Sequence, residues 1–226
     1  MTIHRSVLSA QERGLVSDAL TSYARGWFPM YDSDTGVVNW VQPRWRGVIP
    51  LDQRFRVSRS LRAAVRGGKF TITSDRAFTG VIRACARPRK YEEGTWLDET
   101  IMELFELLHM AGHAHSVEAW VQGPRGPVLV GGLYGLVVGS VFCGESMFSD
   151  PSRGGTDSSK VCLVHLVEHL RQQGFTLLDA QMHNKHLEQF GCFEMEQAEY
   201  AERLFVAAQQ VREWGTLQVR DQPVAL

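Results

Sequence analysis

The stretch Val128–Phe148 reads V-L-V-G-G-L-Y-G-L-V-V-G-S-V-F-C-G-E-S-M-F and carries the clearest structural signal of the chain. Two runs rich in valine, leucine and aromatic residues, typical of buried strands, flank Gly139 and Ser140. Glycine followed by serine suits a two-residue type II′ turn, because the first position of that turn needs a positive φ. The stretch therefore predicts a long antiparallel hairpin with strands over Val128–Val138 and Val141–Phe148.

The segments on either side of this hairpin predict the rest of the fold. An amphipathic helix over Asp98–Ala111 and a strand over Ser116–Val121 precede it. A loop of Gly, Ser and Asp follows it, then a helix capped by Ser158 or Ser159 and a strand over Phe175–Gln181. This order of helix, antiparallel meander, glycine loop, helix and strand resembles acyltransferases of the GNAT type. We expect an α+β fold with a mixed, mostly antiparallel sheet.

The N-terminal part of the chain predicts a smaller unit. Ser9 and Glu12 form a capping-box pattern at the start of a helix that ends at Gly26. Two short strand-like runs, W-F-P-M and V-V-N-W-V, follow this helix. We expect a small N-terminal α/β domain over residues 1–62 and a GNAT-like catalytic domain over residues 63–226.

Charge is distributed very unevenly along the chain, although the net charge is only −1. Residues 44–90 carry thirteen Lys and Arg against two acids, whereas residues 91–226 carry eight Lys and Arg against nineteen acids. A basic block of this size predicts binding to a polyanion, with nucleic acid as the first candidate. A solvated surface that pairs with the acidic remainder is the alternative.

Several classes of function are disfavoured. The four cysteines lie far apart without a C-x-x-C pair, and H-E-x-x-H is absent, so we expect neither a disulfide framework nor a metal site. The G-x-S-x-G elbow of serine hydrolases and the P-loop are also missing. The N-terminus lacks the apolar run of a signal peptide, and no stretch approaches the ~20 apolar residues of a membrane span, so we expect a cytoplasmic protein.

Two strands carry acids in apolar surroundings, where a carboxylate is costly unless it is paired or used. Strict alternation places Glu145 on one face with Cys143 and Met147. It also places Asp179 beside Gln181, about 6.5–7 Å apart along the same strand. The carboxylate of Asp179 could hold the Gln181 amide, so that the amide carbonyl points in a fixed direction. Alternatively, Asp179 is only a turn former at the end of the strand.

A series of motifs extends over roughly residues 15–200. They are G-W-F-P-M (26–30), R-V-S-R-S-L-R (56–62), G-T-W-L (94–97), H-x-x-G-H-A-H-S-x-E-x-W (109–120), L-V-G-G-L-Y-G (129–135), F-C-G-E-S-M-F-S (142–149), S-K (159–160), D-A-Q-x-x-N-x-H (179–186) and L-E-Q-F-G-C (187–192). In this order they resemble the bacterial leucyl/phenylalanyl-tRNA–protein transferases. The resemblance implies transfer of Leu or Phe from charged tRNA to proteins that begin with Arg or Lys. It implies that these proteins are marked for the N-degron pathway, and that neither cofactor nor metal is used.

The resemblance also implies roles for individual residues. Asp179 and Gln181 match the catalytic pair, and Glu145 matches the acid that binds the acceptor. The apolar pocket for the donor side chain is implied at Trp96, Leu133, Phe142, Met147 and Leu178. Contacts with the terminal adenosine of the tRNA are implied at Trp40 and Ser146. The candidates for contacts with the tRNA backbone come from the basic block and are Arg59, Arg62, Arg66, Lys69, Arg87, Arg89 and Lys90.

The chemistry of aminoacyl transfer fits this assignment. The attacking α-amine has a pKa of about 7.7–8.0, so a strong base is unnecessary and an oriented Gln carbonyl suffices. Gln181 and the vicinal hydroxyl of the tRNA remain alternative proton acceptors. An unbranched Cβ suits the pocket, which favours Leu, Phe and also Met as donors. Two other functions stay open: an acetyl-CoA-dependent GNAT N-acetyltransferase and a non-catalytic tRNA-binding protein.

Overall fold

The central hairpin expected from the sequence is confirmed in the computed structural model, which describes residues 8–87 and 97–217. Strand β6 (Gly126–Val138) pairs antiparallel with β7 (Val141–Ser149). Gly139, the first residue of the turn, has φ +60°, and a Cβ there would lie 2.4 Å from the carbonyl oxygen of Ala208. The turn thus needs glycine for both its backbone conformation and its close packing.

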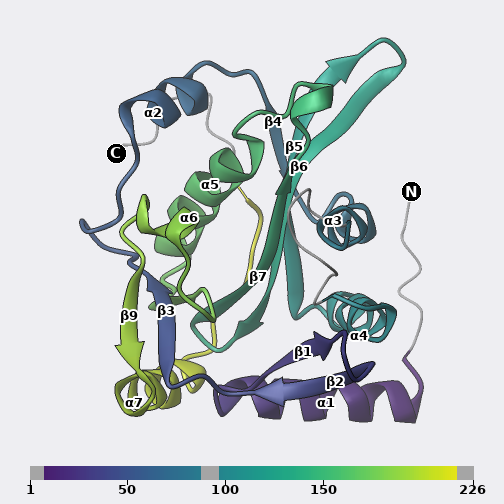
Figure 1. Cartoon of the computed structure of the whole chain (residues 1–226), viewed down its shortest axis with the longest axis vertical. Helices are drawn as coiled ribbons and strands as arrows, with labels where there is room; N and C mark the ends of the chain where they lie inside the picture. The colour runs from purple at the N-terminus through teal and green to yellow at the C-terminus, as the bar shows by residue number, and fades with distance from the viewer. Residues whose placement is uncertain (1–7, 88–96, 218–226) are drawn as a thin grey trace.

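The hairpin forms the middle of a seven-stranded sheet with the order β4-β5-β6-β7-β8-β3-β9 (Figure 1). The other strands are β3 (Trp45–Ile49), β4 (Thr71–Ser74), β5 (Ala114–Gly123), β8 (Leu177–Asp179) and β9 (Phe193–Glu196). Only β7 and β8 pair in parallel among the strands of this sheet that the structure describes. The expected mixed, mostly antiparallel sheet in an α+β fold is confirmed.

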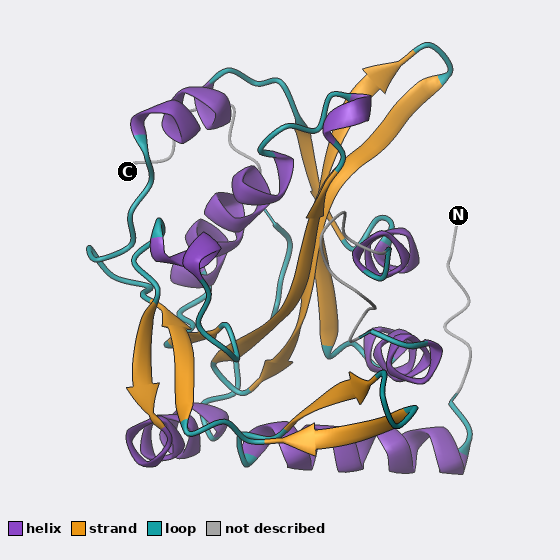
Figure 2. Ribbon diagram, in the orientation of Figure 1, coloured by secondary structure: helices purple, strands orange, loops and turns teal. Residues whose placement is uncertain are grey.

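Helices cover both faces of the sheet (Figures 1 and 2). One face carries α2 (Arg59–Arg66), α5 (Ser158–Gln172) and α6 (Lys185–Glu188). The opposite face carries α1 (Ala10–Ala24), α3 (Phe78–Cys85), α4 (Glu99–Met110) and α7 (Gln197–Ala208). Successive residues of β7 separate accordingly, with Phe142 in one buried apolar cluster and Cys143 in the other. No helix in the described part of the chain combines the length and the apolar character needed to cross a bilayer.

The N-terminal elements include a second, two-stranded sheet of β1 (Phe28–Asp32) and β2 (Val37–Val41). The capping box at the start of α1 is confirmed, because the backbone N–H of Glu12 donates to Ser9 Oγ and that of Ser9 donates to Glu12. β3 follows these elements and is an interior strand of the large sheet, hydrogen-bonded to β8 and β9. The division at residue 62 stays a prediction.

Two expected element ends differ in the structure. Helix α5 is preceded by Asp157 in the left-handed conformation, with φ +61°, and neither Ser158 nor Ser159 caps it. The Ser158 hydroxyl instead donates to the carbonyl of Val130 on β6, so it ties the helix to the sheet. Strand β8 ends at Asp179 and not two residues later, because the chain turns there.

Candidate active site

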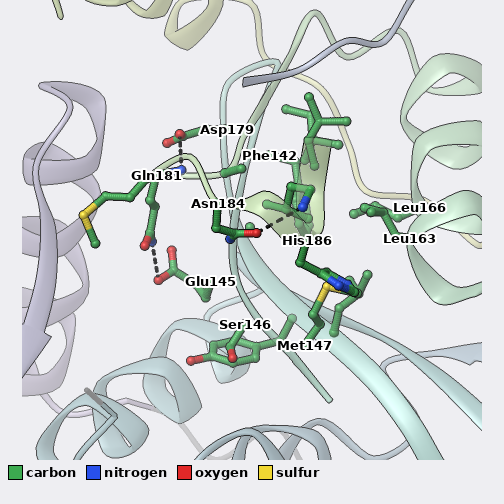
Figure 3. Close-up of a pocket in the computed structure, with 18 of the residues that line it drawn as sticks. Phe142, Glu145, Ser146, Met147, Leu163, Leu166, Asp179, Gln181, Asn184 and His186 are labelled. Atoms are coloured by element: carbon green, nitrogen blue, oxygen red, sulfur yellow. Dashed lines mark hydrogen bonds between the residues drawn. The ribbon is translucent and has the colours of Figure 1, made fainter. Parts of the chain in front are cut away.

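A cavity of about 500 Å³ opens beside β7 and β8 and extends to helices α5 and α6 (Figure 3). Its apolar lining includes Ile49, Leu133, Phe142, Met147, Leu163, Leu166, Leu178 and Leu187. Four of these eight residues are those expected to hold a donor side chain, and Trp96, the fifth expected one, lies outside the described residues. The contributions of α5 and β3 were missed, because they come from elements that are distant in the sequence.

Glu145 enters the cavity from a β-bulge. In the pairing of β6 with β7, Tyr134 lies opposite Ser146 and the next residue, Gly135, lies opposite Gly144. Glu145 is thus the extra residue of β7, and the alternation of side chains shifts by one after it. The expectation that Cys143 and Met147 share a face is wrong for this reason: Met147 packs with the cluster of Phe142.

The carboxylate of Glu145 accepts two hydrogen bonds inside the cavity. Tyr23 on α1 donates its hydroxyl to Oε1 at 2.9 Å, and the side-chain amide nitrogen of Gln181 donates to Oε2 at 2.7 Å. Figure 3 shows the side chains of Glu145 and Gln181 pointing toward one another. Burial raises the pKa of Glu145 to about 8, against the lowering effect of these two hydrogen bonds. A carboxylate offers about four acceptor positions, so Glu145 keeps capacity for a further donor.

Asp179 is fully buried and has a different set of partners. Arg46 on β3 donates from Nε to Oδ1 at 2.8 Å and from Nη2 to Oδ2. The hydroxyl of Tyr200 donates to Oδ2 at 2.9 Å, and the backbone N–H of Gln181 donates to Oδ1 at 2.7 Å. The expectation that Asp179 holds the side-chain amide of Gln181 is therefore wrong. Asp179 holds the backbone, and Glu145 holds the amide.

The backbone at Gln181 is strained. Its φ is +61°, in the left-handed region that residues with a side chain rarely adopt. Gly47 on β3 fixes this turn, because its N–H donates to the backbone carbonyl oxygen of Gln181 at 3.0 Å. A Cβ on Gly47 would lie only 2.9 Å from the backbone nitrogen of His183, so the turn and β3 approach closely. Strain held by surrounding contacts is a feature of functional sites.

Arg46 is the largest residue of the site that the sequence reasoning missed. Its guanidinium lies between the rings of Phe28 and Tyr200, 4.6 Å from each ring centroid, and Nη1 donates to the carbonyl of Gly26. Burial by itself would lower the pKa of Arg46, but Asp179 raises it well above its ordinary value. The sequence signal was a charged residue inside the apolar run R-G-V-I-P, where a partner is required.

The two residues expected at the tRNA end lie in different places. Ser146 lines the cavity. Trp40 on β2 is 37% exposed, and its ring meets the ring of Tyr23 edge-on with the centroids 6.0 Å apart. Tyr23 in turn donates to Glu145, so Tyr23 links Trp40 to the carboxylate. Trp40 does not itself border the cavity that the described residues form.

The basic candidates divide between the two faces of the sheet. Arg59, Arg62 and Arg66 follow one another along the exposed side of α2, and Lys69 comes just after this helix. Arg87 is exposed at the end of α3, on the opposite face. Arg89 and Lys90 lie outside the described residues. The structure therefore groups the α2 residues and separates Arg87 from them.

The histidines take part in packing. His109 stacks on Phe78 at 4.2 Å, and His115 contacts both the carboxylate of Asp75 and the ring of Trp214. Within the described ranges 8–87 and 97–217, no group of three or more His, Cys, Asp or Glu side chains could hold a metal ion.

Comparison with known proteins identifies the family. The family model of the leucyl/phenylalanyl-tRNA protein transferases matches residues 48–205, and the model of their N-terminal domain matches residues 16–44. A leucyl/phenylalanyl-tRNA–protein transferase of Chlorobaculum parvum is 51% identical over 189 residues, which cover 84% of this chain and 93% of the relative. Those of Chlorobaculum tepidum and Pelodictyon phaeoclathratiforme are 48% and 45% identical, covering 84% and 86% of this chain and 93% and 95% of the relatives.

A solved structure shares the fold. The crystal structure of FemX aligns with a TM-score of 0.52 at 13% identity and covers 80% of this chain and 66% of its own. At this identity the likeness concerns the fold alone, and it supports the GNAT-like arrangement expected from the sequence. Because the family model spans most of the chain and the relatives reach about half identity, the chain belongs to the leucyl/phenylalanyl-tRNA–protein transferase family and is an aminoacyltransferase.

Proposed function

We propose that the chain transfers Leu or Phe, and also Met, from aminoacyl-tRNA to the α-amine of proteins that begin with Arg or Lys. The products would be marked for degradation by the N-degron pathway in the cytoplasm, where charged tRNA is available. The observation that carries the proposal is one cavity that combines an apolar lining with the hydrogen-bonded pair of Glu145 and Gln181.

The apolar part of the cavity suits the side chain of the donor. Leu133, Phe142 and Leu178 offer contact area but no hydrogen-bonding group, so shape and size select the donor. Such pockets discriminate by about 1–3 kcal/mol per methylene. Side chains branched at Cβ, such as Val and Ile, would fit less well. Trp40 and Ser146 would meet the terminal adenosine, and the row of arginines on α2 would contact the tRNA phosphates.

Glu145 suits the side chain of the acceptor. Its two hydrogen bonds leave acceptor positions free, and a guanidinium or ammonium group can fill them. An approaching cation also favours the ionised carboxylate, which counteracts the effect of burial on the pKa of Glu145. The side chain of an Arg or Lys acceptor would therefore favour the ionised form of Glu145 that binds it.

Gln181 would align the attacking amine. Since its amide nitrogen is committed to Glu145, its carbonyl oxygen is the end that accepts a hydrogen bond from the α-amine. The amine nitrogen attacks the ester carbonyl carbon, an amide bond forms, and the ester bond to the tRNA ribose breaks. The nitrogen loses one proton, and the departing ribose oxygen gains one. The Gln181 carbonyl stabilises the positive charge on the nitrogen during the attack.

Asp179 would act by positioning. All of its acceptor positions are filled by Arg46, Tyr200 and the backbone of Gln181, so it has no capacity left for a substrate proton. Its contact with the backbone N–H keeps Gln181 in its strained conformation. Loss of Asp179 should abolish transfer because the Gln181 carbonyl loses its direction.

The test uses Leu-tRNA with a radiolabelled leucine and peptides that begin with Arg, Lys, Asp or Ala. We expect label on the Arg and Lys peptides only. Glu145→Gln should lower kcat/KM for these peptides about 10–100-fold, because a charge-assisted contact is lost. Glu103→Gln, an exposed acid on α4, is the matched control and should change nothing.

Other outcomes would overturn the proposal. Equal labelling of Ala and Arg peptides would remove the role of Glu145, and label on Asp peptides would indicate a different acceptor class. Acetylation of the same peptides by acetyl-CoA, without transfer from tRNA, would indicate an acetyltransferase. Binding of charged tRNA without any labelled peptide would indicate a non-catalytic tRNA-binding protein.

A further inference from the structure

The segment that follows α7 crosses the molecule between α5 and the sheet (Figure 1). Its Trp214 is only 7% exposed and contacts Ser74 of β4, His115 of β5, Phe142 of β7 and His169 of α5. No motif of the sequence analysis included this tryptophan. It nevertheless contacts β7 and α5, two elements that contribute to the cavity wall.

Trp214 is held rigidly by polar and aromatic contacts. Its indole N–H donates to Ser74 Oγ at 2.9 Å, and its carbonyl accepts from Nε2 of His169 at 2.7 Å. The ring stacks on His115 with a centroid distance of 4.6 Å and an interplanar angle of 8°. His169 meets another edge of the same ring, with the centroids 4.6 Å apart. A ring packed on several sides resists displacement by a neighbouring side chain.

Phe142 is that neighbour. Its ring stacks on Trp214 with a centroid distance of 5.3 Å and an interplanar angle of 27°. On β6, Gly135 leaves room for the Phe142 ring, because a Cβ there would lie 2.4 Å from its Cε1 atom. Phe142 lines the cavity and is completely inaccessible to solvent, so its ring belongs to the buried apolar part of the cavity wall. The ring is therefore clamped between Gly135 and Trp214.

We propose that Trp214 determines donor specificity by fixing the Phe142 ring in the buried apolar wall of the pocket and so limiting the depth of the pocket there. Trp214 is a positioning residue, because it acts through Phe142 and does not itself line the cavity. The proposal rests on the proposed function in one respect, namely that this cavity receives the donor side chain. It predicts that the size limit for donors is set by a residue of the C-terminal segment.

A smaller side chain at position 214 would let the Phe142 ring recede and would deepen the pocket. A donor larger than Phe would then gain relative to Leu, since each added fragment that fits an apolar pocket changes transfer about 10–200-fold. Binding of the acceptor would not change, because Glu145 and Gln181 lie in the polar part of the cavity and have their own partners.

The experiment measures kcat/KM for one tRNA charged with Leu, Phe or Trp, with an Arg peptide as acceptor. We expect Trp214→Leu to raise the ratio of Trp to Leu donor at least about 10-fold, with the KM of the peptide unchanged. Trp214→Phe should shift the ratio in the same direction by about threefold. Ratios measured on one enzyme preparation are independent of the folded fraction, so loss of stability alone would not move them.

Phe70→Leu is the control, because Phe70 is buried in the same apolar cluster but does not border the cavity. It should leave the donor ratio within twofold of wild type. The inference is overturned if neither Trp214→Leu nor Trp214→Phe moves the ratio by more than twofold. Should Trp214→Leu fail to fold, Trp214→Phe decides. Absence of any transfer by the wild-type chain would instead overturn the proposed function, so the two failures can be told apart.

Discussion

The buried ion pair of Arg46 and Asp179 offers the most quantitative test of the site. Both side chains are almost completely inaccessible, at 1% and 0% exposure. Arg46→Met removes two of the hydrogen bonds of Asp179 and leaves a carboxylate in the interior without a charged partner. Asp179→Asn leaves the guanidinium between two aromatic rings without its counter-ion. The double variant carries neither charge.

The expected magnitudes follow from these contacts. Removal of one partner of a buried pair costs about 3–5 kcal/mol, because the remaining charge stays buried. Each single variant should therefore lose about 3–5 kcal/mol of unfolding free energy. The double variant should lose less than either single one, since replacing both charges is often close to neutral. The coupling energy between the two sites should exceed about 3 kcal/mol.

Urea unfolding at pH 7 measures these free energies, with the slope of the transition checked for each variant. Arg54 and Asp52 supply a matched control, because they form the same kind of pair at 64% and 55% exposure. The equivalent cycle there should give a coupling below about 1 kcal/mol. A double Arg46/Asp179 variant that loses the sum of the two single losses would show that the two buried charges are not coupled. A single variant that loses no more than the exposed control would refute the reasoning as well.

Three further predictions concern the cavity, the turn and the tRNA surface. Burial raises the pKa of Glu145 to about 8, so the carboxyl is mostly neutral below that pH, and the KM of an Arg peptide should fall as pH rises from 6.5 to 9. Tyr23→Phe removes a hydrogen bond that lowers this pKa and should move the fall to higher pH, and superimposable profiles would contradict this. Gly47→Ala places a Cβ 2.9 Å from the backbone after β8 and should lower kcat about 10–100-fold. Gly14→Ala, with nothing within 4 Å on α1, should instead stabilise by about 0.5–1 kcal/mol, and equal kcat in the two variants would argue against a special role of Gly47. Replacing the arginines of α2 by Gln should weaken tRNA binding. It should also reduce the slope of the logarithm of the binding constant against the logarithm of the salt concentration by about 0.7–0.9 per lost phosphate contact. Arg203→Gln on α7 should change neither the affinity nor the slope. An unchanged slope would exclude α2 as the tRNA surface. The arginines to be replaced together are Arg59, Arg62 and Arg66.

Local sequence rules predicted the parts of the fold that local physics decides. The turn at Gly139 depends on a backbone conformation that glycine adopts at low cost, and the structure has it there. The capping box of Ser9 and Glu12 depends on side chains three residues apart, and both of its hydrogen bonds form. The apolar pattern of Asp98–Ala111 likewise became α4, with Asp98 as its N-cap.

The same rules failed where the chain departs from regular structure. Alternation along β7 could not locate the bulge at Glu145, since a bulge is set by pairing with the neighbouring strand. Alternation along β8 could not predict the turn at Gln181, because its left-handed backbone is held by contacts with Gly47 and Asp179. Local rules could not predict the partner of Asp179 either, because Arg46 lies 133 residues earlier in the sequence.

These departures converge on a single side chain. The bulge directs Glu145 to the amide nitrogen of Gln181, while the ion pair of Arg46 and Asp179 fixes the Gln181 backbone through its N–H. A left-handed residue costs about 1–3 kcal/mol, and it persists only when its surroundings determine it on several sides. Because the backbone N–H and the side-chain amide nitrogen of Gln181 are both hydrogen-bonded, its side-chain carbonyl oxygen is the group that can accept a hydrogen bond from a substrate. Fixing an acceptor before the substrate arrives lowers the reorganisation that an amine attack requires, which gives the strain at this turn a chemical use.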